Sequence, residues 1–129
     1  MKYLLDSDTV IDLLQERDET TALIRRLIVE GIGLSVISYM EIRQGLHRKP
    51  DSERLRFHHF ISGIALLPVD TAIADRCAEL RVELMKLKRN VRSRSLDLLI
   101  AATAIEHDLT LVIRNLADFE DAPDLKIHR

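Results

Sequence analysis

The chain has 129 residues, 47% of them hydrophobic, which is the length and apolar content of one ordinary globular domain. Its 19 basic and 21 acidic side chains give a net charge of −2, which argues against a surface that is basic throughout. A single cysteine excludes an internal disulfide, and no apolar run approaches the roughly 20 residues of a membrane-spanning helix. The N-terminus resembles no export signal, so we expect a cytoplasmic protein that does not enter a membrane.

Short apolar runs alternate with amphipathic stretches along the chain. Runs typical of strands occupy residues 2–5, 34–37, 65–69, 109–113 and 125–128. Between them, the apolar spacing predicts helices that start near residue 10, cover 20–30, start at 38, and cover 52–61, 71–88 and 97–107. This alternation predicts right-handed crossovers and a short, mostly parallel sheet between two helical layers, an α/β fold formed by residues 1–129 as one domain.

Three of these elements have clear internal signals. Ser38 followed by Glu41 is a capping-box pattern, which predicts the start of a helix. The segment 97–107 is apolar on nearly every face, so we expect it to be buried. An apolar stripe along one face of a long helix is formed by Ile73, Cys77, Leu80, Leu84 and Leu87.

Acidic residues lie at the ends of several predicted strands. Asp6 ends the first strand, Glu41 lies one helical turn beyond the second, and Asp118 comes shortly after the strand at 109–113. Ligands of open parallel sheets bind beyond the carboxyl ends of the strands, so we expect these side chains at one edge. Each acid alone also fits a structural role. Asp6 or Asp8 can cap a helix, Glu41 can close the capping box, and Asp118 can lie in a polar turn.

Carboxylates that are placed together require a compensating cation. Two of them about 4 Å apart repel by roughly 4 kcal/mol at an effective dielectric constant near 20. A set of hard oxygen ligands suits Mg²⁺ or Mn²⁺ rather than zinc. A metal ion held there activates a water for in-line attack on a phosphodiester and stabilises the leaving oxygen. With these acids committed to cations, the remaining side chains are net positive, which is compatible with a nucleic acid substrate.

Four segments, in this order and over nearly the whole chain, resemble the motifs of one family. Residues 4–14 (LLDSDTVIDLL) are similar to its opening strand-to-helix segment, and residues 35–41 (SVISYME) to its second motif, which ends in an acid. Residues 97–104 (DLLIAATA) are close to its most distinctive motif, and residues 111–119 (LVIRNLADF) resemble the last. The family is that of the PIN-domain ribonucleases, specifically the VapC-type toxins of toxin-antitoxin pairs.

The resemblance implies a catalytic and metal-binding site in a PIN-like three-layer α/β/α fold. The implied acids are Asp6, Glu41, Asp97 and Asp118. Asp6 and Asp97 would be the foremost metal ligands. The implied supporting polar residues are Ser7, Asp8 and Asn115. Without the resemblance, Asp97 is simply an acid in a first helical turn, where it complements the helix dipole.

The resemblance further implies a Mg²⁺- or Mn²⁺-dependent endoribonuclease toxin that blocks translation and forms a homodimer. Its partner would be a cognate antitoxin whose C-terminal segment occupies the groove. One position departs from the family pattern, because Ile113 stands where Thr or Ser usually precedes the Arg-Asn pair. The missing hydroxyl leaves open weaker activity or a narrower substrate range. The RNA that is cut, the number of metal ions and the identity of the antitoxin do not follow from the sequence.

Basic residues gather just ahead of Asp97, in the nine residues from Lys86 to Arg94. One interpretation is a solvated helix end whose cations favour the C-terminal dipole. The other is a rim that grips RNA phosphates over the metal site. The candidate RNA-binding residues are Arg43, Lys88, Arg89, Arg92, Arg94 and Arg114. His58 and His59 are expected at the surface or in helix packing.

Two other functions fit parts of the sequence. Asp6 and Asp8 after an apolar strand also resemble the nucleophile and acid/base pair of haloacid-dehalogenase-type phosphatases, but a suitably placed lysine and a late pair of acids are missing. The second alternative is an inactive PIN-like module that binds RNA or a protein, for which Ile113 is the only hint. Metal-dependent RNA cleavage that Asp6→Asn and Asp97→Asn abolish would separate the three.

Overall fold

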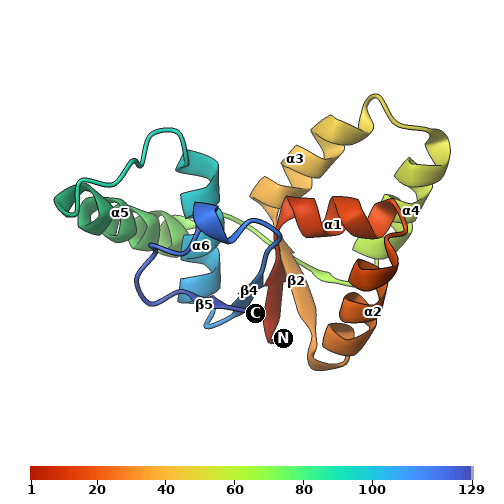
Figure 1. Cartoon of the computed structure of the whole chain (residues 1–129), viewed down its shortest axis with the longest axis horizontal. Coiled ribbons are helices and arrows are strands. Elements are labelled where there is room, and N and C mark those ends of the chain that lie inside the picture. Colours follow the sequence, from red (N-terminus) through yellow and green to blue (C-terminus); the bar gives the residue numbers. More distant parts are fainter. Residues whose placement is uncertain (129) are drawn as a thin grey trace.

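The computed structural model describes residues 1–128, which form a five-stranded sheet with helices on both faces (Figure 1). The strands are β1 (Tyr3–Leu5), β2 (Ile32–Ser35), β3 (Ala65–Leu67), β4 (Thr110–Val112) and β5 (Lys126–Ile127). The helices are α1 (Ser7–Leu14), α2 (Asp18–Leu27), α3 (Val36–Leu46), α4 (Asp51–Ile61), α5 (Thr71–Lys86) and α6 (Ser95–Glu106). Two short 3₁₀ turns are η1 (Ile28–Glu30) and η2 (Leu116–Asp118). Within residues 1–128, no helix has the length and apolar character that crossing a membrane requires.

The sheet has the strand order β3-β2-β1-β4-β5, and every pairing among these strands is parallel. β1 lies at the centre, where Leu4 is opposite Gly33 of β2 and Leu111 of β4. Pro68 interrupts the run at 65–69, which is typical of an edge strand, and β3 does lie at an edge of the sheet. The predicted α/β fold class is confirmed, with a sheet that is parallel throughout rather than mostly so.

Successive side chains of the central strand enter two different hydrophobic cores, because residues of a strand alternate between its faces. Leu4 packs into a core formed with α5 and α6. Tyr3 and Leu5 pack into the other core, formed with α1, α2, α3 and α4. Figure 1 shows these two groups of helices on opposite sides of the sheet. Both faces are therefore covered, which confirms the predicted three layers.

The helices on the α5–α6 side follow the predicted pattern closely. The stripe along α5 is buried from Ile73 to Leu84, whereas Leu87 lies beyond the end of the helix and is 65% exposed. In α6 the small residues Ala101, Ala102 and Ala104 are completely buried. Side chains this small let α6 approach its neighbours closely, and they place its N-terminal turn beside the sheet.

The second strand and the helix after it begin earlier than predicted. β2 ends at Ser35, whose side chain caps α3 by accepting a hydrogen bond from the Ile37 backbone N–H at 3.1 Å. Ser38, the predicted cap, is instead completely buried inside α3. The capping-box interpretation of Glu41 is therefore wrong. The sequence misled here because Val36 and Ile37 continue the apolar run of the strand into the first turn of the helix.

Substitutions at two glycines test how closely other atoms pack against the backbone next to β2 and in α3. Gly31 has a φ of +89°, and a Cβ added there would lie 2.8 Å from the Cα of Met1. Gly31→Ala should therefore cost about 1–3 kcal/mol of unfolding free energy. Gly45→Ala in α3 is the matched control, because its Cβ meets nothing within 4 Å. It should stabilise the protein by up to about 1 kcal/mol through helix propensity. Urea unfolding measures both, and equal effects would contradict this account.

Candidate active site at the switch point of the sheet

The strand order places a topological switch point between β1 and β4. After β1 the chain continues to β2 and β3 on one side, and it later returns to form β4 on the other side. Ligands of open α/β sheets bind in the crevice that such a reversal opens at the carboxyl ends of the strands. Asp6 follows β1, and its backbone N–H donates to the Val112 carbonyl at the end of β4 at 3.1 Å. The candidate site is built around this point.

Asp6 is a buried carboxylate, 6% exposed, that also caps α1. Its Oδ1 accepts a hydrogen bond from the Thr9 backbone N–H at 2.8 Å, so the capping role considered for Asp6 is confirmed. Burial raises the pKa of Asp6, hydrogen bonds from Thr9 lower it in part, and the charge of Asp8 raises it again. The backbone of Arg114 lowers the pKa of Asp6 slightly. Capping and a role in the site are thus combined in one side chain.

Glu41 reaches the same edge from α3. The Ser7 hydroxyl at the start of α1 donates to Glu41 Oε1 at 3.3 Å. Burial raises the pKa of Glu41, Ser7 lowers it, and the charges of Asp97, Asp8 and Asp6 raise it further. Glu41 is therefore directed across to α1 and the other acids rather than back to the start of its own helix.

Asp97 and Asp118 complete the set of predicted acids. Asp97 lies in the first turn of α6, and Asp118 ends η2. Burial raises the pKa of Asp97 most, and the charges of Asp118 and then Asp6 raise it further, while Arg94 opposes them. Asn115, a predicted supporting residue, caps η2 by accepting from the Ala117 backbone N–H at 3.2 Å. Asp97 therefore lies within electrostatic range of the other three predicted acids.

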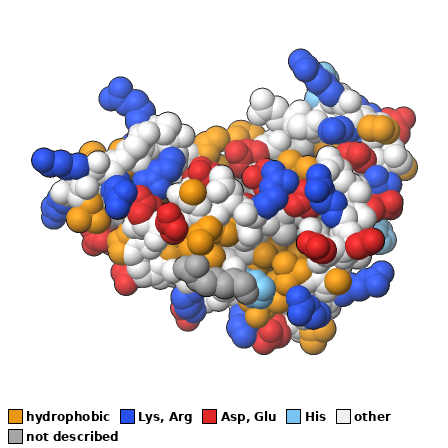
Figure 2. All heavy atoms as spheres, viewed as in Figure 1, with side chains coloured by type: hydrophobic (Ala, Val, Ile, Leu, Met, Phe, Trp, Pro, Cys, Tyr) orange, Lys and Arg blue, Asp and Glu red, His pale blue; other side chains and the backbone are white. Residues whose placement is uncertain are grey.

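Helices from both faces of the sheet begin near the carboxyl ends of its strands. Figure 1 shows α1, α3 and α6 beginning at this edge of the sheet, and Figure 2 shows acidic side chains in the dip between the two halves of the molecule. As the side chains of residues 1–128 lie, no three carboxylates, imidazoles or thiols are close enough together to enclose a metal ion. The donor set nevertheless fits a hard divalent cation, because its atoms are carboxylate oxygens that already repel one another.

Two of the predicted RNA-binding arginines are ion-paired with acids of the protein, Arg94 largely buried and Arg114 half exposed. Arg94 makes a bidentate ion pair with Asp121, at 2.7 Å and 3.0 Å, and it also donates to the Asp118 carbonyl at 3.3 Å. Arg114 pairs with Asp12 at 2.8 Å and with Asp8 at 3.4 Å. The RNA-binding role predicted for these two guanidinium groups from the sequence competes with the bonds that they already make.

The other predicted RNA-binding residues are exposed. Lys88, Arg89 and Arg92 lie on the connection between α5 and α6, and within residues 1–128 no ion pair joins their side chains to a carboxylate. Figure 2 shows basic side chains projecting from this part of the molecule. Arg43 on α3 lies over the Tyr39 ring, 6.0 Å from its centroid.

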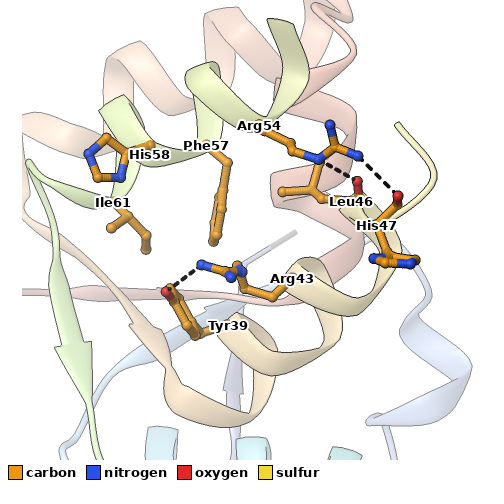
Figure 3. A pocket seen from close by; sticks show the side chains of 8 residues that line it. All are labelled: Tyr39, Arg43, Leu46, His47, Arg54, Phe57, His58 and Ile61. Carbon is orange, nitrogen blue, oxygen red and sulfur yellow. Dashed lines mark hydrogen bonds between the residues drawn. The ribbon is translucent and has the colours of Figure 1, made fainter. Parts of the chain in front are cut away.

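A second hollow lies between α3 and α4, away from the acids (Figure 3). Its volume is about 260 Å³. Arg54 lines it, and its guanidinium donates to the carbonyls of Leu46 and His47 at 3.1 Å and 3.0 Å. Arg54 therefore ties the C-terminal end of α3 to α4. His58 also lines this hollow, which agrees with its predicted place in helix packing.

Sequence reasoning missed Asp12 and Asp121, the acids that hold the two arginines. Asp12 had a usable signal, because it stands between the apolar residues Ile11 and Leu13 of the helix that was predicted to start near residue 10. Asp121 had none, since its partner Arg94 is 27 residues away in the sequence. Ile113, the departure from the family pattern, packs against the core on the α5–α6 side. An apolar contact thus occupies the place of the usual hydroxyl.

Comparison with known protein families matches residues 3–125 to the PIN domain. The chain belongs to the PIN-domain family. Among curated proteins it is similar to the "tRNA(fMet)-specific endonuclease VapC" of Salmonella typhimurium, with 27% identity over 129 residues that cover 98% of this chain and 96% of that protein. The resemblance to VapC-type members of the PIN-domain family, noted from the motifs, is therefore found in comparisons of the whole chain as well.

Solved structures of VapC-containing complexes share the fold. VapBC2 from Rickettsia felis, bound to a DNA fragment from its promoter, matches with a TM-score of 0.89 and 24% identity over 99% of this chain and 98% of that chain. The DNA-bound VapBC of Salmonella typhimurium matches with a TM-score of 0.88 and 26% identity over 99% of this chain and 97% of that chain. The PIN fold of this protein thus extends over essentially its full length.

The Arg94–Asp121 pair gives a pH-dependent prediction. Arg94 lowers the pKa of Asp121, so the pair stabilises the fold above the ordinary Asp value of about 3.9, and this stability is lost as pH falls through the lowered pKa. Asp121→Asn should cost about 1–2 kcal/mol at pH 7, and the cost should shrink at pH 3. Denaturant unfolding at both pH values measures it, with exposed Glu120→Gln as the control. A cost that is independent of pH would refute the ion-pair explanation.

Proposed function

We propose that this chain is the toxin of a type II toxin-antitoxin pair, a VapC-type endoribonuclease that hydrolyses RNA with Mg²⁺ or Mn²⁺. The observation that carries the proposal is the gathering of Asp6, Glu41 and Asp97 near the switch point, where the charges of Asp97 and Asp6 raise the pKa of Glu41 and the charge of Asp6 raises the pKa of Asp97. Such crowding is unfavourable unless a cation relieves it. The family assignment and the similarity to a curated VapC endonuclease support the same chemistry.

Asp6 and Asp97 would hold the metal directly, and Glu41 and Asp118 would complete its oxygen ligands. When bound, a divalent ion there lowers the pKa of a water and stabilises negative charge on the phosphate. Glu41, whose Oε1 is held by Ser7, would accept the proton of the attacking water at Oε2. The water oxygen forms a new bond to phosphorus as the bond to the leaving ribose oxygen breaks, and that oxygen takes a proton from solvent.

The remaining parts of the proposal concern partners. The similar VapBC structures are complexes, which supports a cognate antitoxin as the partner of this chain. Exposed apolar side chains, Met40 on α3, Val82 and Met85 on α5, and Leu96 on α6, support a homodimer that would cover them. Because the proposed toxin cleaves RNA and blocks translation, we expect it to act in the cytoplasm. We treat residues 1–129 as one nuclease domain.

Of the two alternatives, the phosphatase finds no support. It needs Asp8 as an acid/base, whereas Asp8 is ion-paired with Arg114, and the chain belongs to another family. An inactive PIN module that binds RNA or a protein remains a distinct outcome, because Ile113 removes a hydroxyl from the last motif.

Metal-dependent cleavage tests the proposal directly. Purified protein should cut single-stranded RNA with Mg²⁺ or Mn²⁺ and not with EDTA. Asp6→Asn and Asp97→Asn should each lower the rate by at least about 100-fold, because each removes a direct metal ligand. Asp75→Asn, which changes an exposed acid on α5, is the control.

Expression of the wild type should be toxic to cells, and expression of Asp97→Asn should not. Equal toxicity, or RNA bound but never cut, would favour the inactive module.

The exposed α5–α6 connection should contribute to RNA binding. Replacing Lys88, Arg89 or Arg92 by Gln removes one phosphate contact, so RNA affinity should fall and its dependence on salt should flatten by about 0.7 per contact. The change should appear in KM and not in kcat. Arg26→Gln on α2 is the matched exposed control. Fluorescence anisotropy with labelled RNA at several salt concentrations measures the effect, and unchanged salt slopes in all three variants would exclude this connection from the RNA-binding surface.

A further inference from the structure

A buried acid outside the proposed metal site holds an arginine of the last motif. Asp12 on α1 is 7% exposed, and Arg114 donates to its Oδ1 at 2.8 Å. Arg17 also approaches the same oxygen, at 3.3 Å. A carboxylate this deeply buried is costly unless it is paired, so Asp12 requires such a partner. The Asp12–Arg114 pair is therefore part of the folded core of this edge rather than an incidental surface contact.

Arg114 connects this pair to the proposed active site. It is the second residue after β4, and it begins the segment that leads through η2 to Asp118. Asp6 caps α1, and its backbone N–H donates to the carbonyl of Val112, two residues before Arg114, at 3.1 Å. The guanidinium of Arg114 crosses to α1, where it binds Asp12 and also Asp8 at 3.4 Å. Arg114 thus fastens the segment that leads to Asp118 onto the helix that Asp6 caps.

We propose that Asp12 is a positioning residue, which fixes the segment 113–118 against α1 through Arg114 and so sets the spacing of Asp6 and Asp118. Asp12 touches neither the metal nor RNA. The same pair removes the Arg114 guanidinium from the surface that binds RNA, in contrast to the role that the sequence suggested for it. This inference rests on the proposed nuclease function only in its effect on activity, because its structural part applies to the protein without metal.

The structural part is tested by hydrogen exchange in metal-free protein. Asp12→Asn and Arg114→Gln should each speed exchange of the backbone amides of residues 114–118 by about tenfold or more, and the double variant should show no greater effect, because both remove one interaction. Arg114→Lys should restore part of the protection. Arg17→Gln, which leaves the 2.8 Å bond intact, is the control. Unchanged exchange in Arg114→Gln, which is half exposed and expected to fold, would overturn the proposal.

The functional part distinguishes two roles of Arg114, positioning through Asp12 and direct RNA binding, because they predict different effects on the affinity for RNA. As a positioning pair, Asp12→Asn and Arg114→Gln should both weaken Mn²⁺ binding by about tenfold in calorimetry and lower kcat, with the affinity for RNA within about twofold of the wild type. If Arg114 instead grips RNA, Arg114→Gln should weaken RNA binding, and Asp12→Asn, which frees the guanidinium, should strengthen it. RNA affinity is measured with a labelled oligonucleotide in the Asp97→Asn background.

These outcomes separate the inference from the proposed function. Faster exchange of residues 114–118 in a protein that never cuts RNA supports the positioning pair and refutes the nuclease. Cleavage by the wild type together with unchanged exchange and unchanged kcat in Asp12→Asn refutes the positioning pair and leaves the nuclease standing.

Discussion

Like charges resist being brought together, and the parallel sheet brings several carboxylates together where its strands end. Asp6 follows β1 and Asp118 follows β4, while Glu41 and Asp97 reach the same edge from α3 and α6. Burial raises the pKa of Asp6, Glu41 and Asp97, and neighbouring acids raise it further. The fold keeps these carboxylates near one another although their charges repel. A divalent cation would reduce this repulsion, so the repulsion at this edge and the proposed metal-dependent chemistry have the same electrostatic origin.

The arginines around this edge stabilise it from outside the proposed metal site. Arg94 and Arg114 flank the segment that carries Asp118, one from the start of α6 and the other from the end of β4. Each uses its guanidinium on an acid beyond the four, Asp121 or Asp12, and not on the acids themselves. The four carboxylates therefore keep their charge available for a cation, while the backbone that carries them is held in place by ion pairs.

The site also depends on how the two halves of the molecule meet. Asp6 and Glu41 are attached to the core that α1, α2, α3 and α4 share, whereas Asp97 and Asp118 are attached to the core of α5 and α6. The sheet is shared by both cores, and its central strand supplies side chains to each, while Ile37 of α3 also packs against the core of α5 and α6. Packing of small residues in α6 sets how closely its first turn approaches the sheet. Core packing therefore decides the distances between acids that come from different halves.

The sequence by itself determined the α/β class and the order of elements, and its motifs predicted the four acids of the site, because hydrophobic periodicity and short motifs are local properties of the chain. It also showed that Asp6 can cap a helix. Only the tertiary structure decided that Glu41 bonds to Ser7 rather than closing a capping box, and that Arg94 and Arg114 are paired with acids. Arg114 and Asp12 are 102 residues apart. No local pattern specifies such a contact, since it exists only once β4 has paired with β1 and brought the two segments side by side.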